Sequence, residues 1–210
     1  TPAGVNWLIM NNEKPYMDNE NVRHAINCAI DRDSLITVAL NGIGTTSYTQ
    51  MPPNLPGVSE ENIDQYDLEK AKEWLDQSGV DPSEIQFAIL TYDDITKRAA
   101  EVIQANLKEI GIECTIESMD FATFLSKTSE GDFVAAISSY GMCDTISYLN
   151  GVYHSKSIGA SNKTRLNDPQ IDALIDQASK TIDKEEREAL TMECAARSEE
   201  HTSELQSPQN

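Results

Sequence analysis

The stretch of residues 85–116 constrains the fold most, because it contains the pattern of a strand, a helix and a second strand in direct succession. Residues 85–91 form a short, mostly apolar run that is typical of a buried strand. Apolar residues then recur at helical spacing over residues 94–110, and Gly111 separates them from an alternating run over residues 112–116. Such a unit favours a parallel or mixed sheet that is covered by helices and joined by right-handed crossovers.

Similar signals along the rest of the chain add two strands and several helices. We expect the strands over residues 5–11 and 133–139. Capping residues and apolar spacing predict helices that begin within residues 18–21, at Asp33, at Asp67, near Phe121, at Asp168-Pro169 and at Asp183. Residues 140–159 read as an irregular stretch. One α/β domain, with a mixed sheet flanked by helices, accounts for these elements.

The charge of the chain excludes one class of partner. Its 210 residues include 16 Lys and Arg against 35 Asp and Glu, which gives a formal net charge of −19. Binding to nucleic acid depends on Lys and Arg that displace counterions from phosphates, so we expect no nucleic-acid partner. No stretch reaches the roughly 20 apolar residues that a membrane-spanning helix needs.

Signatures of metal and cofactor enzymes are missing from the sequence. The cysteines lack CxxC spacing and read as small buried hydrophobes: Cys28, Cys114, Cys143 and Cys194. There is also no HExxH motif, nucleophile elbow or glycine-rich phosphate loop. We therefore predict no cofactor, no metal site and no enzyme. The competing hypothesis is an enzyme that uses Asp144, Cys143 and His154 as nucleophile, base or metal ligands.

Three stretches of the sequence resemble a known family. The most specific combines Asn11-Asn-Glu-Lys-Pro-Tyr-Met-Asp18 with Val22-Arg-His-Ala-Ile-Asn-Cys-Ala-Ile-Asp-Arg32, in which we expect Arg23 and Asp31 to share one helix. The second is the helix that follows Tyr66-Asp67, and the third runs from Leu107 to Phe133. In this order they are similar to the second lobe of the family 5 solute-binding proteins, which serve ABC importers of oligopeptides, dipeptides and nickel.

The resemblance implies a lobe of the type II periplasmic-binding-protein kind and a role in transport. It predicts a component that binds oligopeptides by closing a cleft and delivers them to ABC permease subunits, outside the cytoplasmic membrane. Nickel, a sugar or another small solute is the alternative cargo. The resemblance further implies that residues 1–196 are lobe II alone, and that lobe I and a lipid anchor, the sole predicted link to the membrane, are missing from this fragment.

The same resemblance points to a ligand segment after the strand at residues 133–139. There Tyr140 stands where the family commonly has Trp, and Gly141, Met142 and Cys143 lead to Asp144. In the family an Asp near this position receives the terminal ammonium of a peptide, and an aromatic residue such as Tyr140 or Tyr148 would enclose the chain beside it. The alternative is that Asp144 caps a short helix.

A second candidate segment is the loop at residues 44–47. Thr45 and Ser47 lie beside Gly44, so the backbone amides of this loop are little obstructed by side chains and could face the cleft. A solvent-exposed loop without a ligand is the alternative.

The end of the chain needs a separate interpretation. Residues 197–210 begin with Arg197-Ser-Glu-Glu-His-Thr-Ser-Glu-Leu-Gln-Ser207, which resembles the translation of a common sequencing adaptor. We therefore predict that the lobe ends near residue 196 and that residues 197–210 are a translated adaptor tail.

Overall fold

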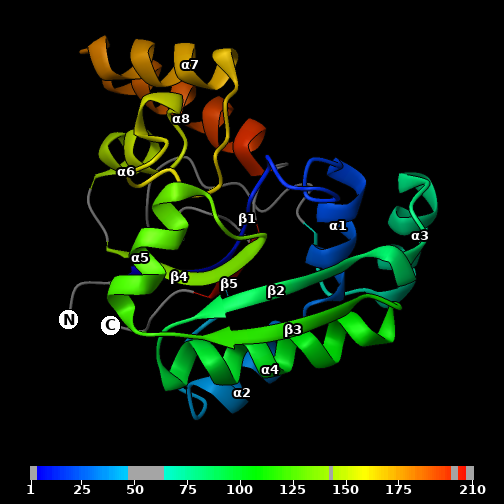
Figure 1. The fold of residues 1–210 in the computed structure, drawn as a ribbon. Coiled ribbons are helices and arrows are strands. Elements are labelled where there is room, and N and C mark those ends of the chain that lie inside the picture. The colour runs from blue at the N-terminus through cyan, green and yellow to red at the C-terminus, as the bar shows by residue number, and fades with distance from the viewer. Residues whose placement is uncertain (1–3, 47–63, 142–143, 200–202, 207–210) are drawn as a thin grey trace.

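The computed structural model describes residues 4–46, 64–141, 144–199 and 203–206, and its strands form one mixed sheet (Figure 1). The strands are β1 (Gly4–Met10), β2 (Gln86–Thr91), β3 (Glu113–Ser118), β4 (Ala135–Gly141) and β5 (Ser203–Gln206). They lie in the order β3-β2-β4-β1-β5. Strand β2 is parallel to β3 and β4, whereas β1 is antiparallel to β4 and β5. The predicted mixed α/β sheet is confirmed.

Helices cover both faces of this sheet. They are α1 (Glu20–Ala29), α2 (Arg32–Ala39), α3 (Leu68–Ser78), α4 (Asp94–Glu109), α5 (Phe121–Glu130), α6 (Thr145–Val152), α7 (Pro169–Lys180) and α8 (Lys184–Glu199), with short 3-10 turns η1 (Pro82–Glu84) and η2 (Ser155–Ser157). Helices α1 to α4 pack on one face, and α5 to α8 pack on the other. The sheet therefore separates two hydrophobic cores.

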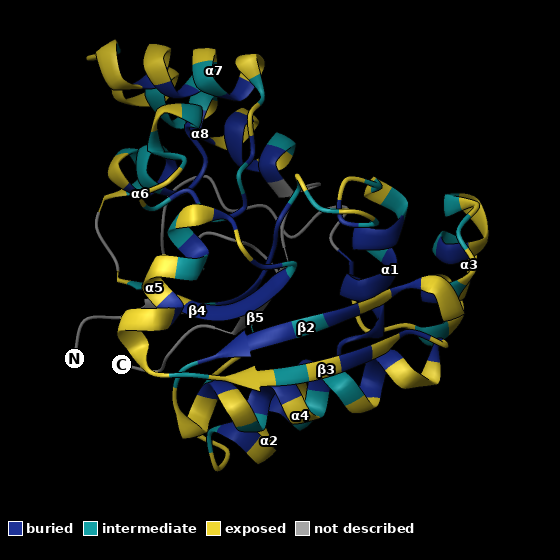
Figure 2. Cartoon of the chain, in the orientation of Figure 1, coloured by how far each residue is buried: buried dark blue, intermediate teal, exposed yellow. Residues whose placement is uncertain are grey.

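Alternation along β1 explains why both cores form. Leu8 and Met10 point into the core beneath α1 to α4, whereas Trp7 and Ile9 point into the core beneath α5 to α8. Successive side chains of a strand point to opposite faces, so a strand with two buried faces is apolar along its whole length. Figure 2 shows the central strands buried and the outer faces of the helices exposed.

The predicted strand, helix, strand unit is present as β2, α4 and β3. Asp93 caps α4 through a reciprocal arrangement in which its carboxylate accepts from the amide of Thr96. Ile103 and Leu107 are buried against the sheet, and Gly111, with φ of 85°, takes the left-handed conformation that turns the chain into β3. Strands β2 and β3 then pair in parallel, as the pattern indicates.

Asn11 and Arg23, two polar residues of the first stretch that resembles the family, join backbone segments of the framework. The buried Asn11 amide donates to the carbonyls of Gly131 and Phe133, at 3.2 and 2.9 Å, which joins the end of β1 to the start of β4. The buried Arg23 guanidinium donates to the carbonyl of Met17 at 2.9 Å. These bonds satisfy backbone groups that would be costly to bury unpaired.

Three local predictions were wrong. Helix α1 ends at Ala29, so Asp31 does not share it with Arg23; instead Asp31 caps α2, where Asp33 was expected. The stretch of residues 140–159 is not irregular throughout, because it contains α6, whose Tyr148 is buried in the second core. Asp31 and Asp33 are both possible caps, and the contacts of the folded chain decide between them. At α6, burial in the core outweighs the weak helix preference of the local sequence.

The predicted tail takes part in regular structure. Helix α8 continues through residue 199, and β5 pairs with β1 along residues 6–8. Arg197 lies 2.8 Å from the carboxylate of Asp168, the residue that caps α7.

Two further expectations concern cysteines and membrane helices. Cys28, Cys114 and Cys194 are buried, as predicted, and each is a free thiol, while Cys143 lies outside the described residues. Burial raises the pKa of Cys28 and Cys194 to about 12 and that of Cys114 to about 11. Within the part of the chain that the structure describes, no helix is long and apolar enough to cross a membrane.

Candidate functional site

The carboxyl ends of three strands meet at one edge of the sheet, and the principal ligand segment predicted from sequence starts there. Because β2 is parallel to β3 and β4, all three strands run toward this edge. Thr91 and Ser118 are paired at the ends of β2 and β3, and β4 continues beyond them to Gly141. Strand β1 begins at the same edge, since Gly4 lies opposite Gly141. The arrowheads of β2 and β3 point toward this edge in Figure 1. In open α/β sheets, ligands bind outside the carboxyl ends of the strands.

Tyr140 lies at the end of β4 and is held by close packing. Its ring is half-buried and meets Tyr148 edge to face, with centroids 5.4 Å apart. A side chain at Gly151 would clash with the Tyr140 hydroxyl unless the Tyr140 ring moved. Gly141 is exposed beside it, whereas Met142 and Cys143 lie outside the described residues. The packing fixes the Tyr140 ring at the start of the predicted ligand segment.

Asp144 is exposed and caps α6, so the capping interpretation is confirmed. Its carboxylate accepts the Ser147 amide at 3.0 Å and the Ser147 hydroxyl at 2.6 Å. These two bonds, chiefly the one from the hydroxyl, hold the pKa of Asp144 below its usual value, so the group is ionised at neutral pH. A carboxylate has roughly four acceptor positions, and capping therefore leaves capacity for an ammonium group.

Asp144 is among the residues that line a hollow of about 410 Å³ between α6 and α8. Lys184 and Arg187 line the same hollow from α8. Lys184 pairs with Glu188 at 3.6 Å, and neither basic residue is within ion-pair distance of Asp144 in the described structure. The negative charge of Asp144 is thus available to a ligand on one side of α6.

Tyr148 is buried in the core, whereas contact with a ligand requires an exposed ring. It is 2% exposed and packs in the core, with Trp7 and Tyr153 at centroid distances of 6.5 and 6.2 Å. Its contact with Tyr140 supports that ring from behind. Tyr148 therefore belongs to the packing of the site rather than to its surface.

The loop at residues 44–47 follows α2, and a hydrogen bond connects the end of α2 to α4, the helix that follows β2. Arg98, in the first turns of α4, donates to the carbonyl of Ala39 at 3.0 Å, which ties the end of α2 to the helix that follows β2. Thr45 is exposed six residues beyond that carbonyl, and Ser47 lies outside the described residues. Only Thr45 of this candidate pair can be located.

A smaller hollow beside Tyr140 involves residues that the sequence analysis did not single out. Its volume is about 170 Å³, and it is lined by Trp7, Ile9, Ser138, Ser139, Tyr140, Ala160, Ser161 and Lys163. Trp7 and Ser138 are opposite each other in the ladder between β1 and β4. Lys163 comes from the segment after η2, and nothing in the polar run Ser161-Asn-Lys-Thr164 distinguishes it from a solvent-exposed lysine.

His154, a member of the competing enzyme hypothesis, is buried and structural in its contacts. Its Nδ1 accepts from the amide of Lys156 at 3.2 Å and lies 3.2 Å from the Asp172 carboxylate. Asp172 in turn accepts the amide and hydroxyl of Ser155. These contacts fix η2 against α7. Within the described ranges no three His, Cys, Asp or Glu side chains are arranged to hold a metal ion.

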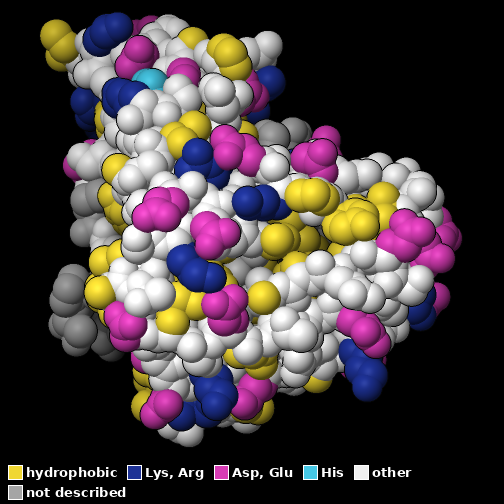
Figure 3. Space-filling model, viewed as in Figure 1, with side chains coloured by type: hydrophobic (Ala, Val, Ile, Leu, Met, Phe, Trp, Pro, Cys, Tyr) yellow, Lys and Arg dark blue, Asp and Glu magenta, His cyan; other side chains and the backbone are white. Residues whose placement is uncertain are grey.

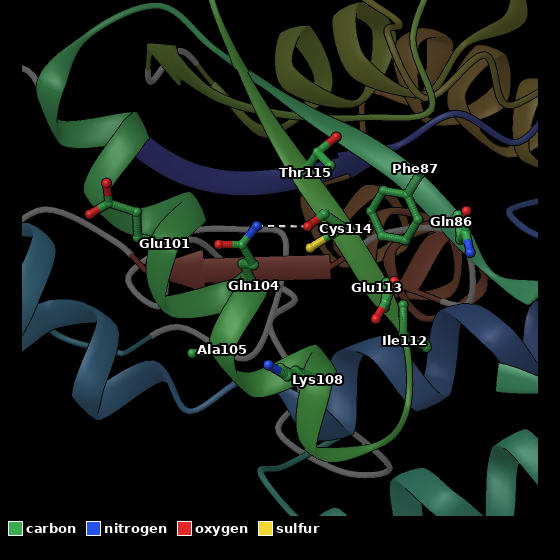
Figure 4. Close-up of a pocket in the computed structure, with 10 residues that line it drawn as sticks. All are labelled: Gln86, Phe87, Glu101, Gln104, Ala105, Lys108, Ile112, Glu113, Cys114 and Thr115. Atoms are coloured by element: carbon green, nitrogen blue, oxygen red, sulfur yellow. Dashed lines mark hydrogen bonds between the residues drawn. The ribbon is translucent and has the colours of Figure 1, made fainter. Parts of the chain in front are cut away.

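A wider hollow lies at the opposite half of β2 and β3. Figure 4 shows this groove of about 770 Å³ between α4 and the edge strand β3. Gln104 crosses it and donates to the carbonyl of Cys114 at 2.7 Å, which satisfies one acceptor of the exposed strand edge. Its lining contains charged side chains of both signs, namely Glu101, Lys108 and Glu113. The groove therefore has fewer features of a ligand site than the carboxyl edge, despite its size.

Surface charge is dispersed on the face seen in Figure 3. Acidic and basic side chains alternate over this face, and the basic ones do not gather into a continuous patch. This agrees with the excess of Asp and Glu in the sequence and gives no support for nucleic acid as a partner.

Comparison with known proteins gives consistent matches. The sequence profile described as bacterial extracellular solute-binding proteins, family 5 middle, matches residues 1–160. The chain is 32% identical to Heme-binding protein A of Haemophilus influenzae over 89% of this chain and 36% of that protein. It is 30% identical to the probable deoxycholate-binding periplasmic protein YgiS of Escherichia coli over 86% of this chain and 35% of that protein.

The fold is similar to that of solved transport proteins. The periplasmic binding protein DppA of Helicobacter pylori, in complex with the peptide STSA, matches 99% of this chain and 42% of its own, with 28% identity and a TM-score of 0.88. The chain spans about a third of the length of the two curated relatives and less than half of this structure.

Proposed function

Because the chain belongs to the bacterial extracellular solute-binding proteins of family 5, we propose that it forms lobe II of the solute-binding component of an ABC importer. The complete protein would bind oligopeptides between two lobes and deliver them to the permease. Residues 1–196 supply one wall of that cleft in this proposal, and lobe I supplies the other.

The main support for the proposal is the match to a peptide-bound transport protein. The chain matches a peptide-bound transport protein over nearly its whole length, yet covers only 42% of that protein. A facing lobe of comparable size is the simplest occupant of the remaining part. Ligands that contact two lobes favour the closed arrangement by their differential affinity, and a permease can distinguish closed from open forms.

The residues proposed to contact solute surround the carboxyl edge of the sheet. Asp144 would receive an ammonium group, and the supported ring of Tyr140 would cover the adjacent chain. Gly141 and Thr45 are proposed to contribute exposed backbone, together with Met142, Cys143 and Ser47 outside the described residues. The free charge of Asp144 beside a hollow supports this arrangement.

Heme is the second candidate solute, because Heme-binding protein A is among the similar curated proteins. Deoxycholate, nickel and sugars are further possibilities. Peptides, heme and deoxycholate differ in shape, but each carries a carboxylate group. We rank oligopeptides first because peptide-binding relatives recur among the matches and because Asp144 offers a site for their ammonium end.

The proposal also includes a location and partners. The complete protein would work outside the cytoplasmic membrane, in a periplasm or attached to the outer face by a lipid anchor. Its partners would be the solute and the permease subunits. We propose binding without turnover, so that a solute incubated with the protein is recovered unchanged.

Native mass spectrometry of the complete protein, purified without removing its ligand, tests this function. We expect co-purified peptides that disappear after unfolding and refolding in ligand-free buffer. Heme, recognised by its visible absorption, or a bound metal or sugar would replace the oligopeptide proposal and keep the solute-binding role. Processing of added peptides, detected by liquid chromatography, would contradict a role limited to binding.

A further inference from the structure

Gly151 is an unexpected residue at its position in α6. It lies in the last turn of the helix, and its φ is not in the left-handed region, so the backbone conformation does not require glycine. Within a helix glycine is less favourable than any residue except proline, because it loses the most conformational freedom on folding. Alanine would form this turn of α6 more readily. The reason for glycine therefore lies in the atoms that a side chain would meet.

A side chain at position 151 would meet the ring of Tyr140. The atom nearest to an added Cβ is the Tyr140 hydroxyl oxygen, which would overlap with it. The next atoms are Cζ of the same ring at 3.2 Å and Oγ of Ser161 at 3.5 Å. Small shifts relieve a contact of 3.2 Å, and 3.5 Å is an ordinary van der Waals distance. The missing side chain of Gly151 thus provides the space in which the Tyr140 hydroxyl lies.

The helix around Gly151 is firmly held. The Ser161 hydroxyl donates to the Gly151 carbonyl at 2.6 Å, which ties this turn to the segment after η2. Tyr148 and Val152, on the same helix, are 2% and 0% exposed. Moving α6 would disturb a close-packed core, whereas the far end of a half-buried side chain can move at lower cost. A clash at position 151 would therefore be relieved by the Tyr140 ring.

The surroundings of the Tyr140 ring determine the direction of that movement. The ring meets Tyr148 edge to face at a centroid distance of 5.4 Å, and Tyr148 in turn packs against Trp7. These rings block movement toward the core. Tyr140 is half-buried and also lines the hollow of about 170 Å³, so space is available away from the core. A displaced ring would move outward at the carboxyl end of β4.

We infer that Gly151 is a positioning residue that acts on the solute through Tyr140. Its missing side chain lets the Tyr140 hydroxyl lie against α6 and keeps the ring back from the place proposed for the solute, beside Asp144. Positions 140 and 151 together would then determine how much room the main chain of a peptide has at this edge. The inference rests on the proposed function only in assigning Tyr140 a contact with solute.

The first test follows the ring in the 210-residue chain. Nuclear Overhauser effects between the ring protons of residue 140 and Tyr148 report their contact in four proteins: the parent, Gly151→Ala, Tyr140→Phe and the double variant. We expect these signals in the parent and in Tyr140→Phe, their loss in Gly151→Ala and their return in the double variant. Phe lacks the hydroxyl that an alanine methyl group would meet, so a change at position 140 rescues a change at position 151.

The second test measures solute binding by the complete protein. The probe is trialanine, which has small side chains and therefore reports the room for a peptide main chain, and its Kd is measured by isothermal calorimetry. Gly151→Ala should raise this Kd about tenfold or more, because the displaced ring occupies part of the site. The double variant should bind within about threefold of Tyr140→Phe, which is the matched control because it carries the second change alone.

Each outcome decides the inference. Contact between the rings that persists in Gly151→Ala would overturn it. So would a loss that the double variant does not restore, or unfolding of both proteins, because α6 itself would then require glycine. Unfolding of Gly151→Ala alone, with a folded double variant, would support it.

The two tests also separate this inference from the proposed function. Unchanged affinity for trialanine despite a displaced ring would remove the action of Gly151 on the solute. A complete parent protein that does not bind trialanine would contradict oligopeptide binding, while the ring contacts in the chain would still decide whether Gly151 positions Tyr140.

Discussion

Asp144 shows how one residue can satisfy two hypotheses that require different properties. Capping α6 needs an oxygen that accepts the Ser147 amide, and that bond is present. Binding an ammonium group needs the negative charge, which the lowered pKa of Asp144 maintains at neutral pH. Asn provides the acceptor without the charge, whereas Ala provides neither. The two substitutions therefore distinguish the roles.

We predict that Asp144→Asn changes the free energy of unfolding by less than about 0.5 kcal/mol, and that Asp144→Ala lowers it by about 1 kcal/mol. In the complete protein both variants should bind free-amine peptides about tenfold more weakly or worse, and N-acetylated peptides as the parent does. Urea denaturation and calorimetry measure the two effects. Undiminished affinity of the Asn variant would leave Asp144 with the capping role alone.

His24 and Asp64 form an ion pair that links α1 to the chain just before α3. Nδ1 of His24 lies 2.5 Å from the Asp64 carboxylate, and the ring stacks on Trp74 with centroids 4.6 Å apart. Burial lowers the pKa of His24, but the hydrogen bond and charge of Asp64, aided by Glu20, outweigh it and raise the pKa overall. The pKa of Asp64 is lowered, because the same pairing outweighs its burial.

The stabilisation from this pair should depend on pH. The His24 contribution is complete below its ordinary pKa of 6.5 and is lost as the pH rises through its raised folded value. The Asp64 contribution is complete above 3.8 and is lost as the pH falls through its lowered folded value. We expect His24→Gln to destabilise the chain by roughly 1.5 kcal/mol near pH 5.5 and by less near pH 8.5.

Denaturation of parent and variant at both pH values measures this difference. Glu20→Gln is a suitable control, since Glu20 is half-exposed and lies 3.6 Å from the other ring nitrogen. It should show a much smaller effect. A loss of stability that is the same at both pH values would assign His24 a packing role on Trp74 instead.

At the scale of elements, local signals predict the ends of helices better than the presence of every helix. Asp67 and Asp168 cap α3 and α7 as expected, because capping needs only a side chain and the next backbone amides. Helix α6 was missed, since its sequence contains Gly151 and β-branched residues of low helix propensity. It is stabilised by burial of Tyr148 against Trp7, a contact between distant parts of the chain.

Contacts between distant parts of the chain cannot be read from local sequence, and this also explains which residues of the candidate site could be predicted. Asp144 and Tyr140 follow a predicted strand, and a resemblance marks that position. Lys163 and Trp7 have no such signal, because the hollow between them exists only when the segment after η2 packs over the junction of β1 and β4. In the sequence, Lys163 belongs to a polar loop and Trp7 to an apolar strand, and neither segment has a feature that indicates a hollow.

Strand β5 tests the interpretation of residues 197–210 as a translated tail. We predict that the chain without these residues still unfolds cooperatively and loses about 1 kcal/mol or less, since it gives up a partly exposed ion pair between Arg197 and Asp168 and a short edge strand. Hydrogen exchange should rise at β1 amides that face β5, while the pairing of β1 with β4 stays protected. Complete unfolding of the shortened chain would show that these residues are integral to the lobe.

At the scale of the whole molecule, the candidate site lies at an exposed edge of the sheet. Tyr140, Gly141 and Asp144 lie at or after the carboxyl end of β4, and Gly141 and Asp144 are exposed. Enclosure strengthens charge-assisted hydrogen bonds because water no longer competes for the same groups. A second lobe would supply that enclosure and convert weak surface contacts into tight binding.

We therefore predict that the complete protein binds its peptide at least about a hundredfold more tightly than the chain of residues 1–196, a difference of roughly 2.7 kcal/mol. Small-angle scattering should show a smaller radius of gyration for the complete protein when peptide is added, because the solute favours the closed arrangement. The chain alone should show no such change, which makes it the control for compaction within the lobe. Equal affinities without compaction would mean that lobe II carries the entire site, and the carboxyl edge would then bind solute as a surface rather than as half of a closing cleft.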